Sequence, residues 1–367
     1  MPQILGKTYS TGTLVLTVAI GIAGVIVARA IGAPLPFMFG SVVAVGAAAV
    51  ARLEIGGARV AFPSDIRSLF VPVIGVAIGG SFTPALLAEA GVWAPSLLAL
   101  VLYIPGIHLA GFLLCHRIGG FDPATAWYGS MPGGFIEAIT MGEERGAEVA
   151  LLTALQFLRL VLCILLVPLA FTLIEGGPVG SAAGVQLPGA ERGLTLPDAA
   201  ILTACGVGGW ILSRRLPIPA AVVAWPMLLS GAAHLTGIVQ GHPPAWLVQA
   251  TQFVIGLTLG VRFSGIARGA LVRAAGISAS IVVGTLLVAA LAGWLLGALV
   301  EESVAAVVLA FSPGGLVEMT LVALSLGLST VYVTAHHVLR ILLAVAFARL
   351  AGDAVLARIG RGGGRPQ

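Results

Sequence analysis

Long stretches without charge constrain this 367-residue chain more than any other feature. Residues 93–115 and 274–300 contain no Asp, Glu, Lys or Arg, and residues 303–339 contain only Glu318. A helix needs roughly 20 apolar residues to cross a bilayer. Charged residues make up 9% of the chain, against about 25% in soluble domains. The sequence therefore predicts an all-α polytopic membrane protein.

The chain also contains one motif twice. MPGGFIEA at residues 131–138 returns as SPGGLVEM at residues 312–319, and the same offset aligns Arg159 with Arg340. Each half contains a matching series of apolar segments, as expected of a duplicated chain. The predicted organisation is a first membrane repeat over residues 1–174, a linker over 175–196, a second membrane repeat over 197–350 and a disordered basic tail over 351–367.

The Pro-Gly-Gly sequence interrupts one apolar segment in each half. Proline removes a helical hydrogen bond, and glycine has the largest entropy cost in a helix. The freed backbone groups are tolerated at membrane depth only where they are buried in protein or line a wet cavity. Each repeat is thus predicted to contain one broken or re-entrant element.

Loop charges indicate how the two repeats are oriented. The first-half loop with Arg52, Arg59 and Arg67 corresponds to residues 237–245, which contain no Lys or Arg. Because cytoplasmic loops are enriched in Lys and Arg, these equivalent loops are expected on opposite sides of the membrane. This favours two inverted repeats of about five transmembrane helices, with both termini cytoplasmic.

Two acidic residues are the predicted ligands of a coupling ion. Glu137 and Glu318 each follow the Pro-Gly-Gly sequence by three residues, in the first turn of the resumed helix. An ionisable group at membrane depth is costly and usually faces an interior cavity. Such a carboxylate can take up a proton or hold a sodium ion, with freed carbonyls as further oxygen ligands. The alternative is that each acid only stabilises its helix N-terminus.

The predicted substrate-binding residues surround the two breaks. A helix that resumes after the break presents N–H groups and partial positive charge, which suit an anion. Arg159 and Arg340, each in the middle of an apolar segment, need an anionic partner. They either pair with the two glutamates or bind substrate, and a packing kink without ligand remains an alternative. The predicted set is Pro132, Gly133, Gly134, Pro313, Gly314, Gly315, Arg159, Arg340, and one turn before each arginine, Gln156 and His337.

Metal, redox and nucleic-acid functions have little support in the sequence. Cys115, Cys163 and Cys205 have unrelated spacings, and no metal-ligand motif occurs. The longest stretch outside the apolar segments, 175–196, is too short for a DNA-reading domain. We expect no enzymatic activity, no cofactor and no direct contact with nucleic acid. The expected partners are the lipid bilayer, a small solute and a coupling ion, for a single chain or a homodimer.

The paired motifs and the arginine downstream of each resemble the AbrB family of bacterial membrane proteins with a duplicated domain, over residues 10–350. Members of that family are labelled regulators of gene expression or ammonia monooxygenases. The family is also similar in outline to the cation/proton antiporter and anion transporter superfamily, whose inverted repeats cross at broken helices. That resemblance places the crossing at residues 132–134 and 313–315.

The residues and the resemblance together imply a secondary transporter in the bacterial inner membrane. It would move a small solute, which can be an anion, by alternating access coupled to H⁺ or Na⁺. A membrane sensor that regulates gene expression indirectly is the alternative. A monooxygenase ranks third, because the sequence has no cluster of His and carboxylate residues to hold copper or iron.

Overall fold

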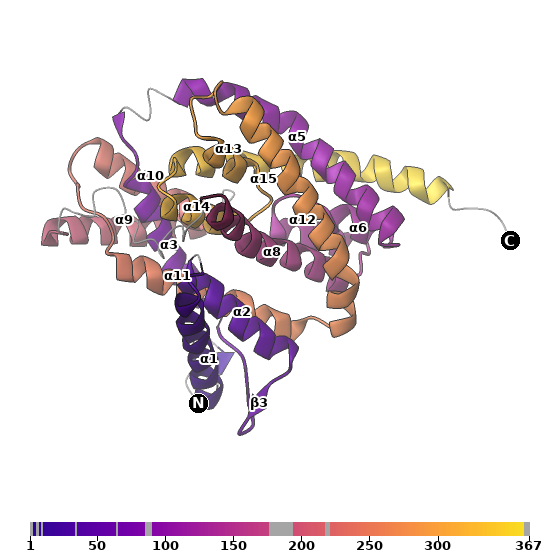
Figure 1. The fold of residues 1–367 in the computed structure, drawn as a ribbon, viewed down its shortest axis with the longest axis horizontal. Helices are drawn as coiled ribbons and strands as arrows, with labels where there is room; N and C mark the ends of the chain where they lie inside the picture. The colour runs from indigo at the N-terminus through magenta and orange to yellow at the C-terminus, as the bar shows by residue number, and fades with distance from the viewer. Residues whose placement is uncertain are drawn as a thin grey trace. The chain divides into compact units, whose positions relative to one another are not determined.

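The computed structural model describes residues 3–4, 7–8, 10–33, 35–63, 65–84, 90–175, 194–216 and 221–362. Most of the predicted linker, 176–193, and the end of the predicted tail, 363–367, lie outside these ranges. The described chain is built mainly of helices (Figure 1). They are α1 (Thr11–Ala30), α2 (Pro36–Val50), α3 (Ile66–Gly79), η1 (Ala90–Trp93), α5 (Ala94–Leu113), η2 (Leu114–Ile118), α6 (Pro123–Gly129), α7 (Phe135–Glu144), α8 (Val149–Glu175), α9 (Leu196–Arg215), α10 (Ala221–Leu235), α11 (Ala245–Gly260), η4 (Val261–Gly265), α12 (Arg268–Leu296), α13 (Val304–Phe311), α14 (Leu316–Ser325) and α15 (Thr330–Gly362).

Several of these helices can cross a membrane. Within the described ranges, the helices that are long and apolar enough are Thr11–Ala30, Gly91–Ile118, Val149–Leu173, Leu196–Arg215 and Arg268–Leu296. Shorter apolar helices are Pro36–Val50, Ile66–Gly79, Ala221–Leu235 and Leu316–Ser325. The helical content and these spans identify a multi-pass membrane protein of the all-α class.

Two short hairpins add to the helices. β1 (Gln3–Ile4) pairs with β2 (Lys7–Thr8), and β3 (Glu54–Ile55) pairs with β4 (Ala58–Arg59). The second hairpin turns at Gly56 and Gly57, which both have positive φ and so avoid the steric cost that a side chain would bring. An all-α prediction did not anticipate these strands, because each is only two residues long.

The C-terminal helix is longer than the sequence predicts. α15 continues to Gly362, so the segment from residue 351 to residue 362 is helical and the predicted disordered tail is wrong there. The glycine-rich end suggested disorder, but a helix that is already formed extends at little cost because only its nucleus is unfavourable. One ion pair also holds this region, between Arg145 and Asp353.

The chain forms two compact units. The first contains Met1–Gly91, Ile164–Gly265 and Leu316–Val331. The second contains Val92–Cys163, Ile266–Gly315 and Tyr332–Gln367. Both units therefore combine segments from both halves of the sequence.

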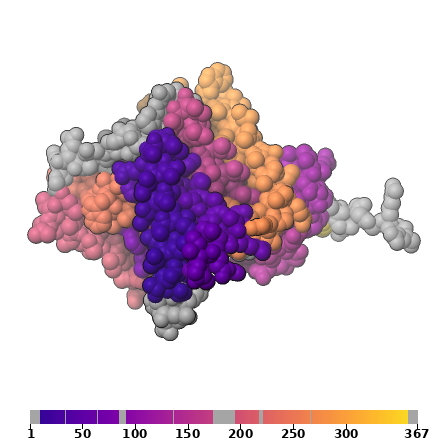
Figure 2. All heavy atoms as spheres, turned by 60° about the horizontal axis from the view of Figure 1, so that its bottom comes forward, coloured from indigo at the N-terminus to yellow at the C-terminus, as the bar shows by residue number. Residues whose placement is uncertain are grey.

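In the first unit, helices from the two halves pack closely through glycines. Gly75 and Gly79 of α3 face α10, and Gly256 and Gly260 of α11 face α2. The offset that aligns the two Pro-Gly-Gly motifs also aligns Gly75 and Gly79 with Gly256 and Gly260. Each of these glycine pairs packs on a helix of the other half. Glycine lets two backbones approach closely at membrane depth. α1 packs beside α2 at one face of this unit (Figure 2).

Substitution of Gly79 is expected to loosen this packing. A Cβ atom at Gly79 would lie 2.6 Å from Ser230 Cβ and 2.7 Å from the Met227 carbonyl oxygen. We expect Gly79→Ala to destabilise the protein by about 1–3 kcal/mol in thermal unfolding in detergent, because the crowded atoms belong to a helix that must shift. Gly284→Ala in α12 is the control, because apart from the backbone of its own helix no described heavy atom lies within 4 Å of the added Cβ. Equal effects of the two substitutions would contradict this prediction.

In the second unit, an aromatic cluster joins α6 to α15. Trp127 is fully buried and its indole Nε1 donates to the Ala348 carbonyl at 3.1 Å. His108 and Phe347 pack against the same indole, with ring centroids 4.3 and 5.8 Å away. A buried Trp requires a partner for its N–H, and this bond supplies it. α6 is thereby held at a defined position on α15.

Candidate functional site

The first Pro-Gly-Gly sequence separates α6 from α7. α6 ends at Gly129 and α7 begins at Phe135. Pro132 lacks an N–H group, and Gly134 adopts a left-handed conformation with φ of 69°. Gly133 lies beside α15, since a Cβ there would be in van der Waals contact with Ile341 Cα at 3.5 Å. The sequence therefore folds here into two short helices with an irregular connection.

Side chains of α8 bind the carbonyls that this break leaves without helical partners. Gln156 Nε2 donates to the carbonyls of Tyr128 at 2.7 Å, Gly129 at 3.2 Å and Met131 at 3.1 Å. Arg159 donates to the Met131 carbonyl as well. Both side chains are buried. The last carbonyls of any helix need such donors, and burial makes the need stronger.

The second break has the same construction. α13 ends at Phe311 and α14 begins at Leu316. His337 Nε2 donates to the Leu309 carbonyl at 2.9 Å, and Arg340 donates to the carbonyls of Ser312 and Gly314. Both breaks thus have carbonyls that accept hydrogen bonds from a buried arginine and from the polar residue one turn before it. In addition, the Tyr103 hydroxyl donates to the Phe311 carbonyl at 2.7 Å.

The sequence left open whether the two arginines pair with the two glutamates or bind substrate. Within the second unit, Arg159 and Arg340 donate to backbone carbonyls of the two breaks. The physical reason is that the C-terminal end of a helix carries partial negative charge and several unpaired acceptors, which a guanidinium with five donors satisfies well. The same carbonyls, expected as ligands for a cation, are already bound to these side chains.

Glu318 is the partner of a different arginine. Its carboxylate is buried, with the side chain 3% exposed, and accepts from Arg67 of α3 at 2.8 Å. Arg262, in η4 beyond the end of α11, belongs to the same group of charges. Burial lowers the pKa of Arg262, repulsion from Arg67 lowers it further, and attraction to Glu318 opposes that shift. All three residues lie in the first unit.

Sequence reasoning missed this cluster for a simple reason. The sequence analysis counted Arg67 as a loop charge that orients the membrane protein. The available signal was the position of Arg67 directly before the apolar sequence SLFVPVIG, since α3 begins at Ile66 and includes Arg67 in its first turn. An arginine inside the first turn of an apolar helix can reach a partner at membrane depth.

Glu137 differs from Glu318 in its surroundings. It lies in the first turn of α7, as predicted, but its side chain is exposed. The Glu137 Oε2 atom lies beside Gly134. A Cβ atom built at Gly134 would be 3.0 Å from this oxygen. The two acids are equivalent in sequence, yet only Glu318 is held in a buried ion pair among the described contacts.

The two buried arginines influence each other within the second unit. Arg159 and Arg340 interact electrostatically with each other, and both also interact electrostatically with Cys163. No group of three or more His, Cys, Asp or Glu residues close enough to hold a metal occurs among the described residues. The second unit therefore brings together the predicted residues Gln156, Arg159, His337 and Arg340, while Glu318 lies in the first unit.

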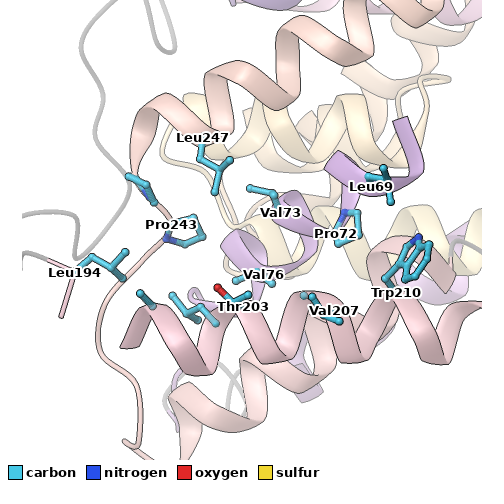
Figure 3. Close-up of a pocket in the computed structure, with 14 residues that line it drawn as sticks. Leu69, Pro72, Val73, Val76, Leu194, Thr203, Val207, Trp210, Pro243 and Leu247 are labelled. Atoms are coloured by element: carbon cyan, nitrogen blue, oxygen red, sulfur yellow. The ribbon is translucent and has the colours of Figure 1, made fainter. Parts of the chain in front are cut away.

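An apolar pocket in the first unit involves none of the predicted site residues. It lies between α3, α9 and the start of α11, and has a volume of about 430 Å³ (Figure 3). Leu69, Val73, Val207, Trp210 and Leu247 are among its fourteen lining residues, none of which is charged. Such a lining suits an apolar group, not an ion.

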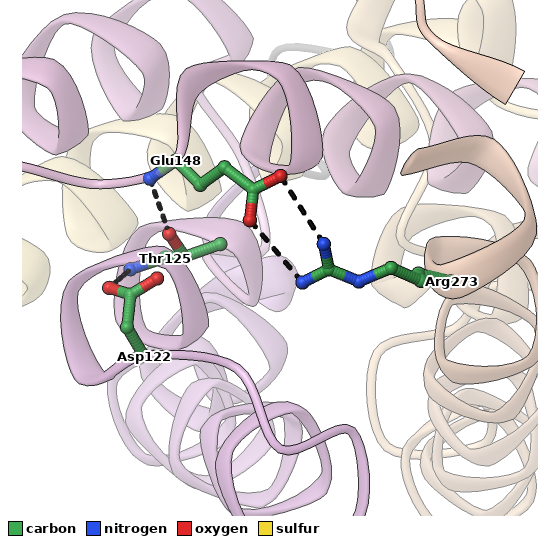
Figure 4. A network of polar contacts seen from close by, with 4 residues as sticks. All are labelled: Asp122, Thr125, Glu148 and Arg273. Atoms are coloured by element: carbon green, nitrogen blue, oxygen red, sulfur yellow. Dashed lines mark hydrogen bonds and ion pairs between the residues drawn. The ribbon is translucent and has the colours of Figure 1, made fainter. Parts of the chain in front are cut away.

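A polar network fixes the other end of α6 (Figure 4). Asp122 caps α6 by accepting from the Thr125 N–H at 2.9 Å, and the Thr125 hydroxyl accepts from the Glu148 N–H at 2.7 Å. Glu148 also pairs with Arg273 of α12 at 3.3 Å. α6 is thus held at its N-terminus by this network and at its C-terminus by Gln156 and Arg159.

Thr125→Val is expected to weaken this network. Valine keeps the shape of the buried Thr125 side chain but removes the oxygen that accepts from the Glu148 N–H. We expect a loss of about 1 kcal/mol of stability, the usual net value of one hydrogen bond, in thermal unfolding. Thr236→Val is the control, because the described bonds of the exposed Thr236 hydroxyl go to carbonyls of its own turn. No loss in the Thr125 variant would contradict the prediction.

Comparison with known proteins identifies the family. The sequence model described as "Transition state regulatory protein AbrB" matches residues 37–355. "Uncharacterized protein YhjN" of Bacillus subtilis (strain 168) is 29% identical over 266 residues, 67% of each chain. "Putative regulator AbrB" of Escherichia coli (strain K12) is 26% identical over 207 residues, which cover 54% of this chain and 57% of that relative. Because the family match extends over most of the sequence, the chain belongs to the AbrB family.

Proposed function

We propose that this protein is a secondary transporter of a small solute in the bacterial inner membrane. It works by alternating access, and transport is coupled to H⁺ or Na⁺. Its two halves are inverted repeats of about five spans each, with both termini in the cytoplasm. The protein acts with lipid, solute and coupling ion, alone or as a homodimer, and has no enzymatic activity.

One observation supports the proposal most strongly. This membrane protein has two buried helix breaks whose carbonyls are bound by the same kinds of side chain. At each break an Arg and a Gln or His of a later helix bind the freed carbonyls. Irregular backbone at membrane depth occurs where it is buried in protein or lines a cavity, and transporters bind solutes and ions at such breaks. The reciprocal packing of α3 on α10 and α11 on α2 supports the duplicated architecture.

In this proposal Glu318 carries the coupling ion. Its carboxylate is buried beside Arg67, so a proton or sodium ion must displace the guanidinium to bind. The exchange of one cation for another on a buried carboxylate would couple ion binding to movement of α3, since Arg67 belongs to that helix. Glu137, which is exposed, is the second carboxylate proposed to bind a coupling ion.

Transport is tested in proteoliposomes containing the purified protein. We expect uptake of at least one labelled compound from a metabolite panel, driven by a pH or sodium gradient. Glu318→Gln should abolish the response to the gradient, because the amide cannot exchange a proton at neutral pH. Glu143→Gln in α7 is the control, because Glu143 is exposed and lies at the far end of that helix. Loss of coupling in the control but not in Glu318→Gln would contradict the assignment.

A sensor function has one specific observation in its favour, the name of the relative "Putative regulator AbrB". A sensor would bind its ligand with no flux in the same proteoliposomes and would need a partner to act on gene expression. A monooxygenase would purify with a redox metal. Binding without uptake across the whole panel and both gradients would therefore replace the transporter proposal with the sensor.

A further inference from the structure

The buried arginines of the second unit have no buried acidic partner. Arg159 is 4% exposed and Arg340 1% exposed, and the charge of Arg159 acts on Arg340. Every acidic side chain described in that unit is exposed or half-exposed. The C-terminal ends of α6 and α13 offset roughly half a charge each. Among the described residues of this unit, a positive charge of about one unit therefore has no buried acidic partner, and burial of such a charge is costly.

The same cluster contains five buried side-chain polar atoms that have no hydrogen-bond partner among the described residues. They are Arg159 Nε, Arg340 Nε, Gln156 Oε1, His337 Nδ1 and His108 Nδ1. His108 belongs to the group because it packs on Trp127 and feels the charge of Arg159. Unpartnered buried polar atoms are rare in proteins, so this concentration indicates a ligand site.

The chemistry of these five atoms defines the ligand. Each arginine Nε can only donate. The two histidines donate through Nε2 to the carbonyls of Leu309 and Trp127, so their Nδ1 atoms accept when the ring is neutral. Gln156 donates through Nε2, which leaves Oε1 as an acceptor. A matching ligand must offer both acceptors for the arginines and a donor for the remaining atoms.

Charge decides which donor fits. An ammonium group would add positive charge to a cluster that holds two guanidinium groups and no buried carboxylate. A hydroxyl donates without adding charge. A carboxylate matches the donors of guanidinium groups better than a neutral acceptor does.

We propose that Arg159 and Arg340 bind the carboxylate of a small 2-hydroxy acid, whose hydroxyl donates to the unpartnered acceptors of Gln156, His337 or His108. This inference rests on the proposed function, because it names the substrate class of the transporter. The two halves contribute one arginine each, so the ligand is bound by equivalent residues of both repeats.

The first test compares three two-carbon acids by calorimetric titration of the purified protein in detergent. The probes are glycolate, acetate and glycine, which carry a hydroxyl, no donor or an ammonium next to the carboxylate. We expect glycolate to bind at least about tenfold more tightly than acetate, since a site built for a hydroxyl rejects the analogue without it, and glycine to bind least. Equal binding of glycolate and acetate, tightest binding of glycine, or no binding of any of them would overturn the proposal.

The second test places a carboxylate inside the site. Cys163 is buried and lies near both arginines, so Cys163→Asp supplies an internal anion. We expect this variant to fold and to lose glycolate binding, whereas Cys163→Ser should keep it. Cys115→Asp is the matched control, because Cys115 is equally buried and no charged neighbour acts on it. A lower thermal midpoint is expected in Cys115→Asp than in Cys163→Asp. Wild-type glycolate affinity in Cys163→Asp would overturn the proposal. The first test uses the unmodified protein, so its result does not depend on whether either variant folds.

The two proposals can fail separately. Glycolate that binds but is not taken up into proteoliposomes under either gradient would overturn transport of this substrate class and leave the binding site in place. Uptake of another solute by a protein that does not bind glycolate would overturn the inference about the ligand and leave transport in place.

Discussion

Replacing Arg340 with Met is expected to destabilise the protein by roughly 2 to 6 kcal/mol. Met matches much of the volume of Arg but donates no hydrogen bonds. The substitution leaves the carbonyls of Ser312 and Gly314 buried without a donor, at about 1–3 kcal/mol each. Relief from repulsion by Arg159 offsets part of this loss. Thermal unfolding in detergent, followed by tryptophan fluorescence, measures the effect.

Arg349→Met in the same helix is the matched control. Arg349 is exposed in α15, and substitutions at such positions usually change stability by less than about 0.5 kcal/mol. Arg340→Lys should lie between the two, because an ammonium group keeps the charge but cannot reproduce the planar fork of donors. If Arg340→Met unfolds at the same temperature as Arg349→Met, the carbonyl-binding role of Arg340 is wrong.

Replacing Arg67 with Gln is expected to cost about 3–5 kcal/mol, the usual penalty for leaving one charge of a buried pair without its partner. The Glu318 side chain is 3% exposed and that of Arg67 is 27% exposed. Glu318→Gln should therefore cost less, because the remaining arginine can reach solvent and the remaining glutamate cannot. Arg262 will reduce both effects, since it also interacts with Glu318.

The double variant Arg67→Gln/Glu318→Gln completes a thermodynamic cycle. We expect it to be more stable than Arg67→Gln alone, because no buried charge is left over, and the cycle gives the coupling energy directly. The hairpin pair Arg59–Glu54 is the control, with side chains 74% and 45% exposed. Such exposed pairs contribute at most about 1 kcal/mol. A coupling energy no larger than that of the hairpin pair would contradict a buried ion pair at Glu318.

The positions of the helices and of their breaks could be predicted from the sequence. A charge-free run such as 274–300 lies largely in one long helix, α12, and α6 and α13 end shortly before the two Pro-Gly-Gly sequences. These features depend on neighbouring residues, because helix length and helix interruption follow from local hydrophobicity and backbone chemistry. The same reasoning treated Glu137 and Glu318 alike, yet Glu318 is buried and Glu137 is exposed.

The partners of these polar side chains were decided by the tertiary structure. Arg159 and Arg340 bind carbonyls of the breaks, and Glu318 pairs with Arg67 from the other half of the chain. The sequence alone determined that this chain forms interrupted membrane helices with buried charges. Which charge meets which acceptor depended on how distant helices pack, since hydrogen bonds and ion pairs act only over a few ångströms and local sequence carries no information about such distances.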